Sequence, residues 1–132
     1  MELPDFAPGL SARVESTVTE ADTAQSLGSG DVPVLGTPRV LALAEAATVA
    51  ATARQLPGGV TTVGTRAEVE HRAPTPIGRH ITALATLAKV DGRKLVFEVA
   101  VRDGEDLVAE VRVERVILDR QRFIAKALGN SM

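Results

Sequence analysis

The chain has 132 residues, of which 45% are apolar, a formal net charge of −2 and no cysteine. This length suits one ordinary domain, and the lack of cysteine excludes disulfides, thiolate nucleophiles and thiolate metal sites. The acidic balance and the few aromatic residues, all phenylalanine, provide neither a basic footprint nor many stacking platforms for nucleic acid. We therefore expect one domain over residues 1–132 that binds neither nucleic acid nor a metal ion.

Neither end of the chain has the pattern of a membrane or export segment. No apolar run is long enough to span a bilayer, and the acidic, proline-rich start lacks the features of a signal peptide. We expect an irregular lead-in at 1–9, a frayed tail at 124–132 and a cytoplasmic protein without membrane contact. The core must rely on Val, Leu, Ile and Ala, and such a light core favours a second subunit.

The first half of the chain predicts a strand, a loop and a long helix. Residues 11–20 alternate in polarity, as in a half-buried strand, and residues 21–36 form a loop rich in Gly, Ser and Asp. The helix is predicted to begin at Thr37, as its N-cap, and to stop before the Pro-Gly-Gly run at 57–59. Its apolar stripe consists of Val40, Leu43, Ala44, Ala47 and Ala50.

Only strands are predicted after the helix. They cover 60–71, 79–90, 94–102 and 107–118, and a proline turn and two Asp-Gly hairpins join them. A single long helix must then cover one face of an antiparallel sheet of about five strands. This α+β order predicts the hotdog architecture, a curved sheet wrapped around a central helix, with another small α+β topology as the alternative.

His71 occupies a position where the pattern favours an apolar residue. It ends the strand 60–71 in the phase of Val63, Ala67 and Val69. A neutral imidazole there is suited to proton transfer near physiological pH. The alternative is a hydrogen-bonded structural histidine at a strand end.

Glu45 and Arg115 are charged residues at positions that we expect to be buried. Glu45 flanks the helical stripe, and Arg115 falls in the apolar phase of the last strand. A buried carboxylate needs a partner or a raised pKa, so Glu45 is a candidate base or nucleophile, unless it lies on a solvated flank. Arg115 needs a carboxylate, a phosphate or solvent, and Glu45 is an attractive partner.

Three segments, taken together, resemble the fluoroacetyl-CoA thioesterase family, a branch of the hotdog thioesterases. They are VLGTPRVLALAEAA, TTVGTRAEVEH and VERVILDRQRF, and the resemblance runs from about Leu35 to Phe123. Each motif is short, and their joint order and spacing carry the resemblance. It implies Thr37, Glu45 and His71 as catalytic residues, and Gly64 and Arg115 as residues that bind the substrate. Without it, Thr37 is explained as a helix cap, and Gly64 as a bulge or a close backbone approach.

The resemblance also implies an activity and an assembly. The expected reaction is hydrolysis of an acyl-CoA thioester, with CoA as part of the substrate and no other cofactor, in a homodimer with sites at the subunit interface. Glu45 would activate water or attack directly, His71 would relay protons, and Thr37 would orient the acyl group or act as the nucleophile. Backbone N–H groups near Gly64 or at the helix start would stabilise the oxyanion.

Two considerations restrict this expectation. In the family's namesake, phenylalanines before the helix form a lid that helps to select the fluorinated acyl group. The corresponding loop at 26–36 has no aromatic residue, which argues against fluoroacetyl-CoA as the substrate. Helix geometry also places the Cα atoms of Thr37 and Glu45 about 12 Å apart. They therefore contact opposite ends of the substrate, or the chain bends before Pro38, or the site combines two subunits.

Three other functions remain open at this point. They are a noncatalytic protein that binds acyl-CoA or a small ligand, a dehydratase-like hotdog enzyme that acts on acyl carriers, and an interaction domain whose function is to form a dimer. Ligand binding without turnover would indicate the first of them.

Overall fold

The computed structural model describes residues 1–129. Its elements are β1 (Ser11–Thr17), η1 (Glu20–Asp22), α1 (Ala24–Leu27), α2 (Thr37–Thr52), β2 (Val60–His71), β3 (His80–Asp91), β4 (Lys94–Asp103), β5 (Asp106–Asp119) and α3 (Arg120–Ala127). The strands form one antiparallel sheet in the order β1-β3-β4-β5-β2, so β1 and β2 are its edges. Among the described helices, none combines the length and the apolar character that a bilayer crossing requires.

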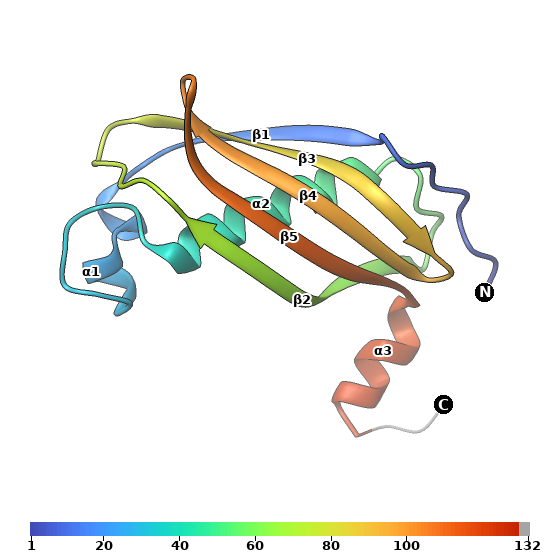
Figure 1. Ribbon diagram of the computed structural model, residues 1–132. Coiled ribbons are helices and arrows are strands. Elements are labelled where there is room, and N and C mark those ends of the chain that lie inside the picture. Colours follow the sequence, from blue (N-terminus) through green and yellow to red (C-terminus); the bar gives the residue numbers. More distant parts are fainter. Residues whose placement is uncertain (130–132) are drawn as a thin grey trace.

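The sheet curves around α2, which lies along its concave face and contacts all five strands (Figure 1). This arrangement confirms the predicted α+β hotdog fold. The buried side of α2 is rich in alanine and threonine, and these small side chains let the helix approach the sheet closely. Ala51 rather than Ala50 continues the buried stripe, and the helix ends at Thr52, one turn before the predicted stop.

The inward faces of β4 and β5 agree with the predicted alternation. In β4 the buried side chains include Leu95, Phe97, Val99 and Val101. In β5 they are Val108, Ala109, Val111, Val113, Arg115 and Ile117. Arg115 therefore lies in the apolar face, as its phase predicts, and its charge has to be compensated inside the protein. A register shift against β4 at the start of β5 pairs Leu107 with the exposed Arg102, so Leu107 does not belong to the buried face, contrary to the prediction.

The predicted phase of β2 is wrong at Val63, because the strand contains a bulge. The ladder with β5 pairs Gly64 with Arg115, shifts register next to Gly64, and then pairs Ala67 with Val113. Both partners on β5 face the helix, so Gly64 and Ala67 do as well, whereas Val63 belongs to the opposite face. Such a bulge re-aims the side chains that precede it.

The predicted strand at 11–20 ends at Thr17, and residues 18–36 are more ordered than the loop predicted at 21–36. The short helices η1 and α1 fold there, and Thr23 caps α1 by accepting a hydrogen bond from the Ser26 backbone. Arg39 of α2 donates to Asp22 at 2.9 Å. These contacts attach the segment to the start of α2.

The predicted frayed tail is also wrong over much of its length, because α3 covers Arg120–Ala127. The Asp119 side chain accepts a hydrogen bond from the Arg122 backbone at 3.0 Å and caps this helix. That capping signal is present in the sequence. Residues 130–132, the end of the predicted tail, lie outside the described part of the chain.

Candidate active site

Thr37 does not cap α2, contrary to the prediction, and its hydroxyl is therefore available for another contact. Gly36 is the N-cap, in an extended conformation, and no side chain caps the helix. A Cβ at Gly36 would come within 3.0 Å of the Ala24 backbone, so only glycine fits there without displacement. The Gly36 backbone N–H also donates to the Asp22 carbonyl at 2.9 Å. The ordered segment before the helix thus sets the position of Thr37.

His71 lies at the end of β2 and meets Thr37. The Thr37 Oγ1 and the His71 Nδ1 are 2.8 Å apart. The strand end is held because the backbone N–H groups of Arg72 and Ala73 both donate to the Val108 carbonyl. The spacing is within the range that a hydroxyl nucleophile and its base require.

The imidazole of His71 is partly withdrawn from water. Burial lowers the pKa of His71 below its usual 6.5, and the polar backbone of Ala73 nearby only partly opposes this shift. The ring is therefore neutral at neutral pH. Its Nε2 is buried, and no group within residues 1–129 forms a hydrogen bond with it. A buried, unsatisfied ring nitrogen beside a hydroxyl is a feature of sites that exchange protons with a ligand.

Glu45 and Arg115 form a second polar group further along α2. The Arg115 Nη1 donates to the Glu45 Oε2 at 3.2 Å, which confirms Glu45 as the acid that the buried arginine needs. The Arg115 side chain is 7% exposed and that of Glu45 is 39% exposed. The cation is therefore enclosed, whereas the carboxylate, which was expected to be more buried, reaches the surface.

Thr62 holds the rest of the Arg115 guanidinium. Nε donates to the Thr62 hydroxyl at 3.0 Å, and Nη2 donates to the Thr62 carbonyl at 3.1 Å. Burial lowers the pKa of Arg115, and the charge of Glu45 opposes that shift. The Arg115 donors point at Thr62 and Glu45, so Arg115 fixes the position of the Glu45 carboxylate. No contact in the structure supports the predicted role of Arg115 in binding the substrate directly.

Gly64 leaves the space in which the Glu45 carboxylate lies. A Cβ at this position would overlap the Glu45 Oε2. The sequence contained a signal for this, because a glycine inside a strand often marks a bulge or a close approach. Thr62, by contrast, was not predicted as part of the group; its two-residue spacing from Gly64 is the only local hint.

A small hollow of about 220 Å³ opens next to the carboxylate. Its lining residues are Glu45, Gly64, Thr65, Arg66 and Ala67. The carboxylate thus faces a space that a reacting group or a water molecule can enter.

The two polar groups are separate within one chain. Thr37 and Glu45 belong to the same α-helix, which begins at Thr37 itself, so a bend before Pro38 does not bring them together. Their Cα atoms are about 12 Å apart along a regular helix. Both groups lie beside the free edge of the sheet, because β2, which carries Gly64 and His71, pairs with β5 alone within residues 1–129.

A curved antiparallel sheet around one helix, with a hydroxyl–imidazole pair and an arginine-held carboxylate at its edge, defines a hotdog-fold protein with a candidate hydrolytic site. Comparisons with known proteins extend this result. The family model for fluoroacetyl-CoA-specific thioesterase, FlK, matches residues 18–121. A fluoroacetyl-CoA thioesterase from Streptantibioticus cattleyicolor is 37% identical over 93 residues, which cover 70% of this chain and 67% of that protein.

Solved structures agree with the sequence comparisons. The fluoroacetyl-CoA thioesterase FlK superposes with a TM-score of 0.88 at 28% identity, covering 97% of this chain and 99% of that chain. A hot-dog-like protein from Thermanaerovibrio acidaminovorans gives a TM-score of 0.86 at 25% identity, covering 94% and 92%. The chain belongs to the fluoroacetyl-CoA-specific thioesterase family, which confirms the resemblance seen in its sequence.

Proposed function

We propose that this protein is a thioester hydrolase that acts on acyl-CoA. The observation that carries the proposal is the pair of polar groups beside one sheet edge, Thr37 with His71 and Glu45 with Arg115. Family membership supports the same activity. Thioester hydrolysis needs an activated nucleophile, a proton carrier and stabilisation of an oxyanion, and these groups supply the first two.

Glu45 is the proposed base. A water molecule adds to the thioester carbonyl carbon and gives its proton to the Glu45 carboxylate. The oxyanion then collapses, the carbon–sulfur bond breaks, and CoA leaves as a thiolate. Direct attack by Glu45 would instead produce an enzyme-bound anhydride, which water must hydrolyse.

His71 and Thr37 are the proposed proton carriers. The neutral imidazole accepts the proton that water has given to Glu45 and passes a proton to the departing thiolate, so the ring and the carboxylate both return to their starting states. Its Nε2 forms no hydrogen bond within residues 1–129 and is open to this exchange. The contact at 2.8 Å with Thr37 orients the ring. Thr37 then serves mainly to hold the imidazole and the acyl group, because no contact places its hydroxyl beside Glu45.

The proposed active unit is a homodimer with its sites at the subunit interface. Two observations support it: the free edge of β2 and the separation of the two polar groups. Pairing of two β2 edges brings the Glu45 group of one protomer toward the Thr37 and His71 of its partner. The expected size in solution, measured by light scattering during gel filtration, is therefore that of two chains.

The first experiment measures thiol release from a panel of short and medium acyl-CoAs. We expect turnover by the wild type, and loss of it on Glu45→Gln. Glu98→Gln is the matched control, because Glu98 is an exposed strand carboxylate that pairs with Arg112 outside the site. Absence of turnover on every thioester, with ligand binding intact, would instead support the noncatalytic binding protein.

A mixing experiment tests the shared site. His71→Asn and Glu45→Gln variants are each expected to be nearly inactive. If each site uses residues of both protomers, refolding the two variants together restores up to about half of the activity in mixed dimers, since one of the two sites is then intact. A mixture that stays inactive despite verified heterodimers would show that each site is built within one chain.

The acyl group is left unassigned by this proposal. The segment 26–36 contains no aromatic residue, so the proposal does not extend to fluoroacetyl-CoA. A cytoplasmic location and the lack of any cofactor besides the CoA of the substrate remain predictions.

A further inference from the structure

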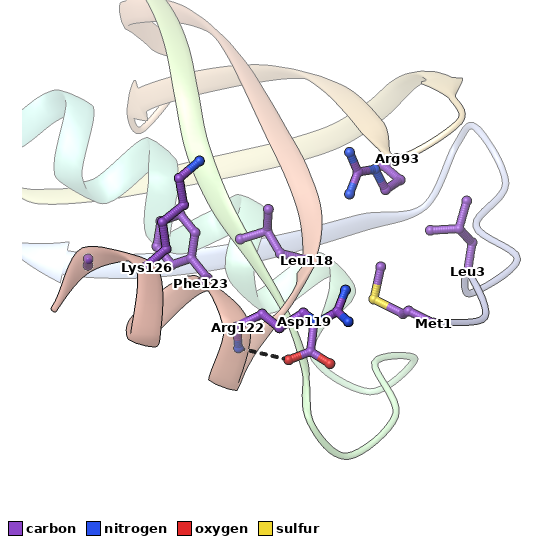
Figure 2. Close-up of a pocket in the computed structure, with 9 residues that line it drawn as sticks. Met1, Leu3, Arg93, Leu118, Asp119, Arg122, Phe123 and Lys126 are labelled. Carbon is purple, nitrogen blue, oxygen red and sulfur yellow. Dashed lines mark hydrogen bonds between the residues drawn. The ribbon is translucent and has the colours of Figure 1, made fainter. Parts of the chain in front are cut away.

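A large hollow lies beside α3, outside both polar groups. Its volume is about 930 Å³, and its walls are the N-terminal segment, the turn between β3 and β4, the end of β5 and one side of α3 (Figure 2). The site described above does not use it. α3 has no buried residue and contacts mainly β5, so its inner side is accessible from this hollow.

Three cations line the hollow: Arg93, Arg122 and Lys126. None of them has a carboxylate within 4.0 Å in residues 1–129. Arg122 and Lys126 are one turn apart on α3 and therefore share a side of the helix. The single acid in the wall, Asp119, accepts the Arg122 backbone N–H as the helix cap. This is a cationic patch on a chain whose net charge is −2.

An apolar floor accompanies these charges. Leu118 and Phe123 lie between Lys126 on one side and Arg93 on the other in Figure 2. The Phe123 residue is 43% exposed, so it offers surface to a ligand. Cations around an exposed aromatic ring suit a ligand that combines phosphates with a planar base.

The distance between the α3 hollow and the Glu45 carboxylate suits one ligand that reaches both. Asp119 follows Arg115 by four residues of β5, which is about 13 Å of strand. A second hollow of about 380 Å³ has both Thr62, the partner of Arg115, and Arg120, the neighbour of Asp119, in its wall. Most of its other lining residues are uncharged, including Val49, Leu56 and Gly59. An uncharged linker suits a hollow in this position between the carboxylate and the cations.

We infer that the α3 hollow binds the phosphorylated nucleotide end of CoA. Arg93, Arg122 and Lys126 contact its phosphates, Phe123 stacks on its base, and the pantetheine arm passes by way of the second hollow to Glu45. The inference rests on the proposed acyl-CoA thioesterase activity and assigns the residues that select CoA over an acyl carrier protein, which has no such nucleotide at its thioester arm.

The test compares two thioesters of the same acyl group, one on CoA and one on pantetheine, which lacks the nucleotide. For Arg122→Glu/Lys126→Glu we expect KM for the acyl-CoA to rise about tenfold or more with kcat retained, since a charge-assisted contact is worth roughly one decade. The kinetics on acyl-pantetheine should not change. Arg13→Glu/Lys89→Glu is the matched control, because it makes the same charge change at exposed positions of β1 and β3.

A binding measurement separates failure of this inference from failure of the proposed function. Calorimetry with adenosine 3′,5′-bisphosphate should show binding to wild type and control, and loss of binding in the α3 variant, whether or not any thioester is hydrolysed. Equal binding of inorganic phosphate would overturn the inference, since it would indicate a simple anion site. Equal KM effects on both thioesters, or a requirement for these cations only with acyl carrier protein thioesters, would also overturn it. Loss of all turnover with bisphosphate binding intact would count against the thioesterase proposal alone.

Discussion

The two polar groups of this protein are held by different physical means. Thr37 and His71 meet through one contact between a helix start and a strand end, and each is positioned mainly by backbone hydrogen bonds. Glu45 is instead held by a side-chain network, in which the enclosed Arg115 is bound twice by Thr62. A network built on a buried charge tolerates little change, whereas a single neutral contact is easier to replace.

The largest effect is expected where the reacting group itself is removed. Glu45→Gln keeps the shape of the side chain and removes the base, so we expect kcat to fall about 10³-fold, within the range found for general bases. Steady-state thiol release is the measurement. If kcat of the Glu45→Gln variant stayed within threefold of the wild-type value, the base would have to be His71, beside Thr37, and not Glu45. Single-turnover reaction in ¹⁸O-labelled water separates the two routes, because only attack by Glu45 leaves label in its carboxylate.

His71→Asn is expected to lower kcat about 10²-fold, since it removes the proton carrier but keeps a polar side chain. The pH dependence supplies the sharper test. Burial lowers the pKa of His71, and the neutral form is the active one, so wild-type kcat/KM should stay high below pH 6.5 and fall at still lower pH. The variant should lose this limb of the profile. A limb that persists unchanged in the variant would assign it to another group.

Gly64→Ala tests the space around the carboxylate without altering any charge. The new Cβ would overlap the Glu45 Oε2, so the flexible end of that side chain must move off Arg115. We expect kcat to drop about 30-fold, with at most about 1 kcal/mol lost from the free energy of unfolding. Kinetics and urea denaturation measure the two quantities. Ala88→Gly, at an exposed position of β3 outside the hollow beside Glu45, is the control for strand flexibility.

Thr37→Val is expected to have the smallest effect, about tenfold on kcat, because it removes one hydrogen bond while the backbone still positions His71. Thr37→Ser should be close to wild type. Since Thr37 is not the helix cap, the free energy of unfolding should change by less than about 0.5 kcal/mol in Thr37→Ser. A loss with Thr37→Val as large as that of Glu45→Gln would indicate that the hydroxyl is the nucleophile.

Much of the fold was predictable because its signals are local. Alternation located all five strands, the Asp-Gly pairs marked two hairpins, and Arg115 was correctly placed in the buried face of its strand. The missed helix α3 is an error of a different kind, because its Asp119 cap is a local signal. Other errors occurred where a contact between distant segments decides the conformation. Gly36 replaces Thr37 as the cap because the segment before the helix packs tightly against Ala24. Residues 18–36 are ordered for the same reason, because contacts such as that of Asp22 with Arg39 attach them to α2.

The residues of the candidate site could be predicted from the sequence, but only some of the contacts between them could. The apolar phases of helix and strand singled out Glu45, His71 and Arg115, and they suggested that the first and last meet. The contact between Thr37 and His71 joins residues that are 34 positions apart, and no periodicity encodes it. The part played by Thr62 depends on the β2 bulge, which a two-residue period does not anticipate.

By itself, the sequence determined the order of the elements and the faces that they bury, because apolar periodicity and turn residues act over a few positions. The tertiary structure decided which polar groups meet. The register of β2 on β5 sets Gly64 opposite Arg115, and the packing of α2 on the sheet places Glu45 beside both. These relations arise from the packing of whole elements, since a helix position and a strand position become neighbours only when their apolar faces have closed on each other.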